Sequence, residues 1–569
     1  MLQYQHMKLL VEMQNIIKET LIDFGIVDGI IRFELPTDIT HGDYATNVAM
    51  VYAKQIGVKP RELAEKIVTA LQGKKIPEIA HIDIAGPGFI NIILSAEYFY
   101  QSIQEIFDKK DQYGKNELLL GKKILIEHSS PNLFKPFHIG HLMNNAIGES
   151  LVRIMKSSGA QVTTLSFPSD VSLGIAKALF VLLEEHGNNY EPNNVSILGD
   201  AYVVGTRLYD ENESIHARVK EIADNLYAEK NSPEWKLYQK CKALNLAYFE
   251  QIIQSLDSHI DAYIYESQTG IIGKQLVEKN IPQVFTASEG AIVYIPEESK
   301  KGLHTAVFIN SQGNPTYEAK DLGLIQMKFE KYQPDLSLFI TDIQQVSHFV
   351  VVLDAMQKIN GDWGDKSQHI THGRMTLRGQ KMSSRMGGVP LAEEVIQMIL
   401  DEVKNRSNGR SIDIKTQKSI ALAAIKFSIL KARPGQNIDF NPETSLSFEG
   451  DSGPYLQYTH ARIQTLFEKA KEQELFPKLH SVSSGELLIK LLDRFPEIVI
   501  QAAYDYAPSH IVTYTLELAR AFNSFYGNYK FIDVENREQS ENYLALAQAT
   551  GQVISNALHL LGIHAPYKM

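Results

Sequence analysis

The chain has 569 residues and a mass of 64.1 kDa, so it is too long for a single hydrophobic core and we expect about three or four domains. Its composition, 44% hydrophobic and 22% charged, is that of a globular protein, and no segment approaches the roughly 20 unbroken apolar residues that a membrane helix needs. The formal net charge of −11 argues against nucleic-acid binding driven by bulk positive charge, although it leaves room for a local basic face.

Residues 1–112 have the pattern of a small domain that mixes helices and strands. Residues 1–20 place polar side chains among apolar ones at helical spacing, which predicts a helix and differs from the apolar core of a secretory signal. We therefore expect the protein to remain in the cytoplasm. A second helix is predicted around residues 59–72, and the strand-like sequence HIDIAGPGFINIILS follows. These patterns indicate an N-terminal α+β domain.

From Lys122 the pattern changes to alternating strands and helices. The segment KILIEHSS is strand-like, a helix is predicted from about His138 to Ser158, and QVTTLSF is again strand-like, which together indicate a βαβ unit. We therefore expect a Rossmann-type α/β domain with a parallel sheet over residues 113–410, interrupted by a mostly helical insertion at about residues 168–303.

Residues 411–569 have long amphipathic helical patterns and no strand signal, as in TQKSIALAAIKFSILKA and LALAQATGQVISNALHLLG. These patterns predict a C-terminal all-α helical bundle. The fold class expected for the chain is therefore α/β, with the parallel-sheet domain between an N-terminal α+β domain and a helical bundle.

The segment EHSSPNLFKPFHIGH, from Glu127 to His141, joins a strand end, a loop and a helix start, which is where open α/β sheets bind ligands. His138 and His141 lie on one face of the first helical turn, where ring N–H groups and the helix dipole can meet phosphate oxygens. Gly140 leaves room for a base or ribose against the backbone. A His-x-x-His pair alone is more often structural, so this interpretation needs a second signal.

A second segment, RGQKMSSRMGG from Arg378 to Gly388, is a glycine-flanked loop with several cations. Lys381 can place a point charge on a pyrophosphate while Ser383 and Ser384 donate hydrogen bonds to it. The simpler interpretation of this segment is a solvated basic loop.

Together the two segments resemble the HIGH and KMSK signatures of class I aminoacyl-tRNA synthetases, in the expected order and at the expected separation. The arginyl members of that class resemble the chain over nearly its whole length. The stretches that carry this resemblance are GDYATN from Gly42, SPNLFK from Ser130, PTYEAKD from Pro315, FEGDSGPYLQY from Phe448 and the final LGIHAPYKM. The resemblance implies an arginine–tRNA ligase, which activates arginine with ATP and transfers it to the 3′ end of tRNA(Arg).

For ATP, the resemblance implies that cations and ring donors stabilise the charge on the phosphates, with magnesium bound mainly through ATP itself. The implied catalytic residues are His138, His141, Lys381 and Lys135. The implied ATP-binding residues are His138, Gly140, His141, Met375, Lys381, Ser383 and Ser384. Many arginyl enzymes lack the KMSK lysine and rely on the lysine before HIGH, whereas this chain has both, so the division of labour between them stays open.

A buried guanidinium needs a carboxylate in bidentate reach and neutral acceptors for its other protons, and Asp321 and Glu127 can supply the charge. The resemblance implies that Asp321, Tyr317 and Gln345 hold the arginine side chain. It implies further that Glu127 and Asn132 line the pocket and hold the α-amino or carboxylate end of the amino acid.

Simpler alternatives stay open for two of these residues. Glu127, at a strand end, can pair with His128 or Lys123, and Tyr317 can be an ordinary core aromatic. One stretch also departs from the family, because residues 166–174, SFPSDVSLG, stand where the family commonly has Gly-Asp-Trp-Gly. No role can be carried over to that stretch.

The resemblance implies tRNA contacts at both ends of the chain. In the N-terminal domain Asn47, Phe89 and Asn91 are the candidates, since a ring can stack on an unstacked base at the outer corner of the tRNA and an amide can bond to it. Phe89 and Asn91 can equally be ordinary strand residues. The C-terminal bundle would read the anticodon, with aromatics between Tyr504 and Tyr529. Members of the family generally need bound tRNA even for activation, and they are usually monomers.

Other functions remain open at this point. Another class I synthetase is the nearest, although the single cysteine, Cys241, is incompatible with the zinc site of cysteinyl enzymes, and the Asp321 region argues against large apolar substrates. A tRNA-binding paralogue without catalysis is a second alternative, which the intact HIGH and KMSS segments disfavour. A small-molecule adenylate-forming ligase is a third, and it would leave the long helical C-terminus without a purpose.

Overall fold

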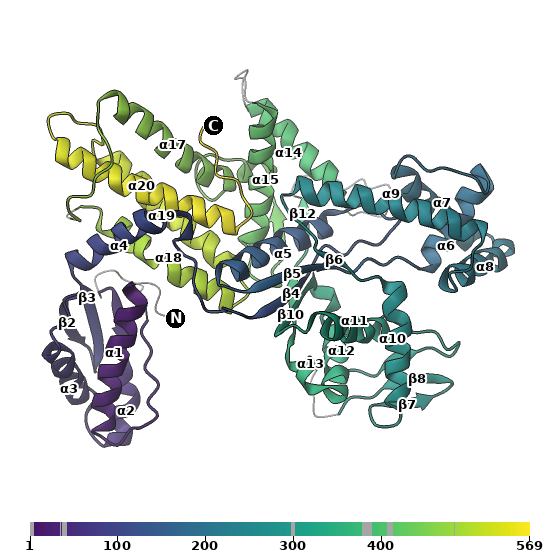
Figure 1. The fold of residues 1–569 in the computed structure, drawn as a ribbon, viewed down its shortest axis with the longest axis horizontal. Helices are drawn as coiled ribbons and strands as arrows, with labels where there is room; N and C mark the ends of the chain where they lie inside the picture. The colour runs from purple at the N-terminus through teal and green to yellow at the C-terminus, as the bar shows by residue number, and fades with distance from the viewer. Residues whose placement is uncertain are drawn as a thin grey trace.

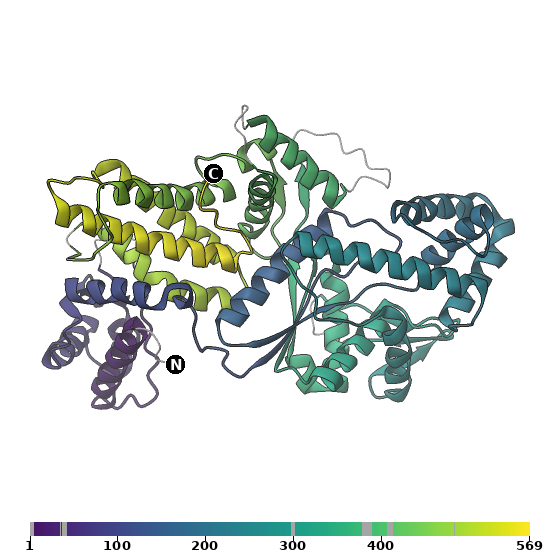
Figure 2. The same ribbon diagram turned by 45° about the horizontal axis from the view of Figure 1, so that its top comes forward.

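The structure is a computed structural model that describes residues 5–34, 36, 42–297, 302–377, 390–406, 413–482 and 484–569. A small N-terminal domain lies beside the C-terminal helices, a helical unit lies at the opposite end of the molecule, and the central sheet lies between them (Figures 1 and 2). Within the described residues, none of the helices is long and apolar enough to cross a membrane.

The N-terminal domain is a three-stranded sheet with helices packed against it. Its strand order is β1-β3-β2, and both pairings are antiparallel. Apolar residues at helical spacing on α3, from Leu63 to Leu71, are buried, which gives this domain its core. The elements are α1 (Gln5–Ile22), β1 (Tyr44–Thr46), α2 (Val48–Ile56), α3 (Pro60–Gly73), β2 (Ile79–Ala85), β3 (Phe89–Leu94) and α4 (Ala96–Lys109).

The central sheet has five strands in the order β11-β10-β4-β5-β6, and every neighbouring pair is parallel. Its strands are β4 (Lys123–Glu127), β5 (Gln161–Ser166), β6 (Ala262–Tyr263), β10 (Leu336–Asp342) and β11 (Ser367–His372). The helix α5 (Ile139–Ser157) connects β4 to β5, which confirms the predicted βαβ unit. Because parallel strands share one carboxyl edge, Glu127, Asp342 and His372 all come to the same side of the sheet.

A helical unit follows β5 and forms its own apolar core, which includes Leu179, Val219 and Tyr238. Its helices are α6 (Leu173–His186), α7 (Ser196–Glu211), α8 (His216–Tyr227) and α9 (Pro233–Ser255). The chain then returns to the central sheet as β6, so the expected insertion is not continuous.

A second lobe combines helices with a small antiparallel sheet of order β7-β8-β9. Its strands are β7 (Phe285–Ser288), β8 (Ala291–Tyr294) and β9 (Ala306–Ile309). Its helices are α10 (Glu266–Lys279), α11 (Tyr317–Tyr332), α12 (Val346–Ile359) and α13 (Gly361–Asp365).

Where the structure describes it, the C-terminal part is helical apart from one short strand. The strand β13 (Ile438–Phe440) pairs in parallel with β12 (Met375–Leu377), although the sequence predicted no strand after residue 411. A strand this short carries no periodic signal that a sequence pattern can reveal. The helices are α14 (Ala392–Arg406), α15 (Ile414–Leu430), α16 (Pro442–Ser445), α17 (Gly453–Glu472), α18 (Glu486–Tyr504), α19 (Ser509–Asn528) and α20 (Arg537–Leu560).

Buried polar contacts join the N-terminal domain to the bundle. Tyr98 and Ser102 on α4 donate hydrogen bonds to Asp493 on α18, at 3.1 and 2.6 Å. Lys490, one turn earlier on α18, forms an ion pair with Asp43 at 2.9 Å. Burial raises the pKa of Asp493 to about 6, so the two hydroxyl donors stabilise a carboxylate that the apolar surroundings disfavour.

The helices α10 and α11 approach each other closely. A Cβ at Gly273 would lie 1.7 Å from the carbonyl oxygen of Ala319, and one at Gly323 would lie 2.1 Å from that of Thr269. Only glycine permits this approach, which sets the position of α11 and of the Asp321 that it carries.

We predict that Gly273→Ala destabilises this lobe by about 1–3 kcal/mol, because backbone on both helices must move to admit a methyl group. Urea unfolding followed by tryptophan fluorescence measures the change, since Trp363 stacks on Phe329 of α11 at 5.7 Å. The matched control is Gly527→Ala on α19, where a Cβ would meet no atom within 4 Å. Equal stability of the two variants would contradict this account of the helix contact.

Candidate active site

The first turn of α5 fixes the ring orientation of both histidines. Nδ1 of His138 accepts a hydrogen bond from the backbone N–H of Gly140 at 3.1 Å, and Nδ1 of His141 accepts one from the N–H of His138 at 3.2 Å. The two rings stack with their centres 3.8 Å apart. Because Nδ1 is an acceptor in both rings, each neutral imidazole carries its proton on Nε2, and both Nε2–H groups are available as donors.

Electrostatics keep these two rings neutral. Burial lowers the pKa of His138, and the nearby Lys135 lowers it further. Burial also lowers the pKa of His141 well below its usual value, with His138 and Lys135 adding to the effect. The positive charge near them comes instead from Lys135, whose Nζ lies 5.1 Å from the ring centre of Tyr202. Two neutral donors, one cation and the positive end of a helix dipole suit an anion such as phosphate.

The structure joins the second signature segment to the first through its C-terminal flank. The N–H of Ile139 donates to the carbonyl of Pro390 at 3.0 Å, and the N–H of Ala392 donates to that of Phe137 at 2.9 Å. Residues 378–389 are not among the described residues. The predicted ATP ligands in that range, which lie outside the described residues, are Lys381, Ser383 and Ser384.

Met375 is buried in β12, on the N-terminal flank of the same segment, and it pairs with Ile438. Gly373 lies so near Gln436 that a Cβ there would be 2.3 Å from the Gln436 carbonyl oxygen. The backbone at Met375 is therefore held firmly by the neighbouring strand, and its contact with adenine stays a prediction.

Asn144, which sequence reasoning missed, ties α5 to the ends of two strands. Its side-chain oxygen accepts the N–H of Ser129, just after β4, at 2.6 Å, and its side-chain nitrogen donates to the carbonyl of Ile340 in β10. The sequence held a signal for it, since Asn144 lies one helical turn after His141, on the same face of the predicted helix.

Asp321 lies on α11 beside His348, another residue that sequence reasoning missed. Nε2 of His348 lies 2.6 Å from Oδ2 of Asp321, and its Nδ1 lies 3.5 Å from Oε1 of Glu318. Burial alone would lower the pKa of His348, but hydrogen bonds to the two carboxylates raise it to about 9. Burial raises the pKa of Asp321, and the bond from His348 opposes that effect. His348 is therefore protonated at neutral pH and Asp321 is its counter-ion.

Glu127 is paired with neither His128 nor Lys123, the two alternatives left open by the sequence. It forms a buried ion pair with Lys328 of α11, whose side chain is 2% exposed. The charge of Glu127 also raises the pKa of Asp321, so both carboxylates belong to one anionic region. The sequence signal for Lys328 was weak, since it lies two helical turns after Asp321 among apolar residues that are buried.

The remaining predicted arginine ligands are exposed. Tyr317 is 66% exposed at the start of α11, which rules out the alternative of a core aromatic. Gln345 is exposed at the end of the 3-10 helix η4 (Ile343–Gln345), and Asn132 is exposed in the loop before α5. The structure thus brings Glu127 and Asp321 together, while contacts of the other three with arginine stay predictions.

The stretch of residues 166–174, which departs from the family, has a structural role. Asp170 is 1% exposed and lies 2.8 Å from Nζ of Lys242. It also accepts hydrogen bonds from the backbone and the hydroxyl of Ser267, both at 2.9 Å. Asp170 therefore ties the loop after β5 to α9 and α10.

Three protein-family models match the chain, one after another along its length. The family model for the catalytic domain of class I tRNA synthetases (R) matches residues 102–441, which is more than half of the chain. The model for the arginyl-tRNA synthetase N-terminal domain matches residues 11–94, and that for the DALR anticodon binding domain matches residues 456–569. The chain belongs to the arginyl-tRNA synthetase family.

Similar proteins agree with this membership along nearly the whole chain. The arginine–tRNA ligase of Borrelia garinii subsp. bavariensis is 31% identical over 533 residues, with 89% of each chain covered. That of Treponema denticola is 29% identical over 555 residues, with 93% of each chain covered. Among solved structures, arginyl-tRNA synthetase of Thermus thermophilus has a TM-score of 0.78 at 23% identity, covering 98% of this chain and 99% of that one. The Plasmodium falciparum enzyme has a TM-score of 0.80 at 21% identity, with 99% and 98% covered.

In this member of the arginyl-tRNA synthetase family, the N-terminal candidates lie on one strand and directly after the strand that pairs with it. Phe89 is 38% exposed and Asn91 is half-buried two residues later on β3, so both are on the same face of the sheet. Asn47 directly follows β1, whose Ala45 pairs with Asn91. Their contact with tRNA stays a prediction.

The bundle holds a pocket of about 470 Å³ in the range that matches the anticodon binding domain. The guanidinium of Arg462 lies 4.7 Å from the ring centre of Tyr458, and its Nη1 donates to Asn523 at 2.6 Å. Tyr526 and Lys568 also line this pocket. Sequence reasoning expected aromatics from Tyr504 to Tyr529 here, and it missed Arg462 and Tyr458.

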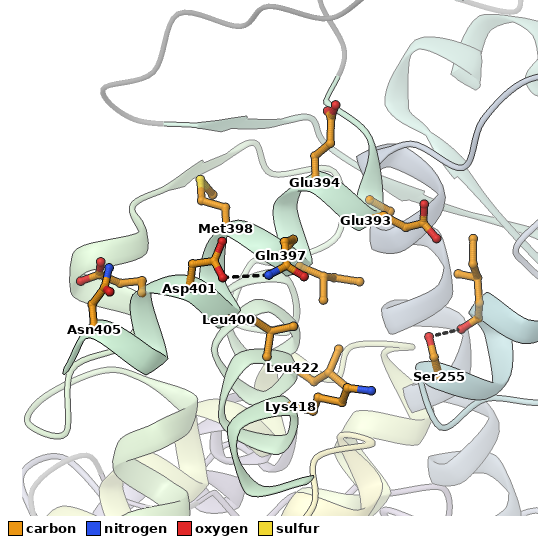
Figure 3. Close-up of a pocket in the computed structure, with 14 residues that line it drawn as sticks. Ser255, Glu393, Glu394, Gln397, Met398, Leu400, Asp401, Asn405, Lys418 and Leu422 are labelled. Carbon is orange, nitrogen blue, oxygen red and sulfur yellow. Dashed lines mark hydrogen bonds between the residues drawn. The ribbon is translucent and has the colours of Figure 1, made fainter. Parts of the chain in front are cut away.

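A larger cavity, of about 950 Å³, is lined by none of the predicted catalytic or ATP-binding residues that the structure describes. Figure 3 shows that its lining comes mainly from α14, with Lys418 and Leu422 of α15 and Ser255 of α9. Its acidic side chains are Glu393, Glu394, Asp401 and Glu402, against the single cation Lys418. This excess of negative charge is unsuited to binding phosphate groups, so the cavity is not the nucleotide site of the synthetase.

We predict that His141→Gln retains more of the ATP-dependent activity of the synthetase than His141→Asn. The amide nitrogen of glutamine can occupy the position of Nε2, the donor that stays available because Nδ1 accepts the N–H of His138. The amide nitrogen of asparagine lies near the position of Nδ1 instead. Loss of such a donor costs about 100-fold or more in rate. Steady-state rates at saturating ATP measure the difference, and equal losses in the two variants would contradict the tautomer assignment.

Proposed function

We propose that the protein acts as an arginine–tRNA ligase, activating arginine with ATP and transferring it to the 3′ end of tRNA(Arg). The observation that carries the choice of amino acid is the cluster of carboxylates around Asp321. Glu127 and Glu318 bring two further carboxylates, while Lys328 is the buried lysine that pairs with one of them. The excess of negative charge suits a cationic side chain, and a guanidinium fork matches a carboxylate in two parallel hydrogen bonds.

In the first step the arginine carboxylate attacks the α-phosphate of ATP in line, and pyrophosphate leaves. The protein contributes position and charge stabilisation, without a covalent nucleophile. The Nε2–H groups of His138 and His141 donate to phosphate oxygens as charge builds on them, and Lys135 and Lys381 bring positive charge. Gly140 and the backbone at Met375 accommodate the nucleoside.

Magnesium would accompany ATP, bound mainly by the phosphates. It is a hard cation that prefers oxygen ligands and keeps much of its water, so it does not require a protein cage. In the described part of the chain no group of three or more His, Cys, Asp and Glu side chains is arranged to hold a metal ion.

The arginine side chain would lie between α11 and η4. Tyr317 is one helical turn before Asp321, and its exposure supports contact with a ligand. Gln345 supplies a neutral acceptor for the guanidinium protons that Asp321 leaves unpaired. Glu127 and Asn132 would hold the α-amino or carboxylate end of the amino acid.

In the second step the terminal ribose hydroxyl of the tRNA attacks the arginyl carbonyl of the adenylate, and AMP leaves. Asn47, Phe89 and Asn91 would contact an unstacked base at the outer corner of the tRNA, since an exposed ring with amides nearby suits stacking and hydrogen bonding. The pocket beside Arg462 would take an anticodon base, because a guanidinium against tyrosine rings offers both a stacking plane and donors.

The functional division of the chain follows from these sites. Residues 1–112 would bind the tRNA corner, residues 113–410 would carry the chemistry, and residues 411–569 would bind the anticodon. The helix α15 shares an apolar core with α5, so the last region is anchored directly on the catalytic one. Since one chain carries all these sites, we propose that the protein is a monomer. We also propose that it works in the cytoplasm, where tRNA is charged for translation.

We predict that the purified protein charges total tRNA with arginine and with none of the other nineteen amino acids, in the presence of ATP and magnesium. Asp321→Ala should lower kcat/KM for arginine by about 100-fold or more, because a guanidinium would lose its buried counter-ion. Attachment of labelled amino acids to tRNA measures this, with the exposed Asp365→Ala on α13 as control. Charging with another amino acid would overturn the assignment, and no charging at all would favour a non-catalytic paralogue.

We also predict that Arg462→Gln raises KM for tRNA by about tenfold, the cost of a lost charge-assisted contact, and leaves KM for arginine and ATP unchanged. Lys471→Gln is the matched control, because it removes the same charge from an exposed position on the same helix, α17. Equal effects of the two substitutions would show that charge alone matters and would remove the case for a base pocket.

A further inference from the structure

The ring of His348 lies between two carboxylates of the neighbouring helix. His348 is in the first turn of α12, while Glu318 and Asp321 are one turn apart on the same face of α11. Nε2 contacts Oδ2 of Asp321 at 2.6 Å, and Nδ1 faces Oε1 of Glu318 at 3.5 Å. The ring thus contacts, through one of its two nitrogens, the carboxylate that is assigned to the substrate guanidinium.

The other groups around the His348 ring are either paired elsewhere or neutral. His348 is therefore the partner of Asp321 that a ligand can displace. Lys328 is already bound to Glu127, in a buried pair whose two opposite charges act on Asp321 in opposite directions. On β11, His369 lies 2.7 Å from Thr341, and burial lowers its pKa to about 4, with His348 adding to the effect. His369 is therefore neutral and does not compete for the carboxylates.

Two further groups face this region from the sheet. Burial lowers the pKa of His372 on β11, so this ring is neutral as well. Asp342, at the end of β10, lies 4.0 Å from Nε of Arg374 and acts on His372 rather than on His348. The charge state of His348 is thus set by the two carboxylates of α11.

We propose that His348 holds the place of the substrate guanidinium on Asp321 in the empty enzyme and gives up that carboxylate when arginine binds. His348 is then a positioning residue for arginine, and this inference rests on the proposed function. A buried carboxylate without a partner is costly, so the imidazolium keeps Asp321 ionised and oriented while the pocket has no substrate. A guanidinium takes both carboxylate oxygens at once, which a single ring N–H cannot do, and arginine can therefore displace it.

This exchange couples arginine binding to a proton. Without arginine the two carboxylates hold the pKa of His348 near 9, whereas arginine removes Asp321 from the ring and places a cation beside it. The pKa of the ring must then fall, so arginine binds the deprotonated form better and its binding releases a proton. Affinity for arginine consequently rises with pH up to about 9 and levels off above it, by at most about tenfold per pH unit.

The test is the pH dependence of arginine binding in the wild type and in His348→Gln. Glutamine can still donate a hydrogen bond to Asp321 but has no titratable proton. KM for arginine in tRNA charging is measured from pH 6.5 to 9.5, and calorimetry with L-arginine in phosphate and in Tris buffer counts the protons released. We expect KM of the wild type to fall by about tenfold between pH 7 and 9, with proton release, and the variant to show neither.

His510→Gln is the matched control, because His510 forms a comparable pair with Asp505, at 2.9 Å, in the bundle far from the site. Its pH profile should equal that of the wild type. The proton count of the wild type keeps the inference testable if His348→Gln does not fold, since equal observed enthalpies in the two buffers, whose ionisation enthalpies differ, would mean that no proton is released and would overturn it. Parallel pH profiles for the wild type and His348→Gln would overturn it as well. A wild type that never charges tRNA with arginine would overturn the proposed function itself, and this inference with it.

Discussion

Two hydrogen bonds from the single side chain of Asn144 hold the candidate site in register. Its side-chain oxygen accepts a hydrogen bond from the N–H of Ser129 after β4, and its side-chain nitrogen donates one to the carbonyl of Ile340 in β10. The helix α5 therefore cannot slide along the sheet without losing both bonds. A parallel sheet supplies the common carboxyl edge, but it does not decide where a helix begins relative to that edge. Because His138 and His141 are in the first turn of the same helix, the position of their Nε2 donors depends on this anchor.

Two buried carboxylates of the catalytic region are each paired with a lysine from another element. Asp170 pairs with Lys242, and Glu127 pairs with Lys328. Removing one partner would leave a costly buried charge, so these pairs fix how the elements sit against one another. Asp321 differs from them, because its partner is a histidine whose proton can leave. That difference separates a carboxylate of the binding site from those of the scaffold.

The surfaces proposed to bind tRNA share one apolar core with the catalytic sheet. Buried residues of this core come from the N-terminal domain, as Ile67, from β4, as Ile126, and from the bundle, as Leu488. Since such interiors are closely packed, the positions of these three regions are mutually constrained. The helical unit of α6 to α9 and the lobe of β7 to β9 have separate cores, so they are packed onto this body as distinct units.

The sequence by itself determined the βαβ unit, the long C-terminal helices and the pair His138 and His141, because each leaves a periodic or local signal within a few turns of chain. It did not determine the partner of Glu127, which is 201 residues away, nor the contact of His348 with Asp321, because both depend on how α11 and α12 pack at the sheet edge. Only the tertiary structure decided the charge states, since burial and neighbouring charges arise from packing and shift each pKa away from its value in a free side chain.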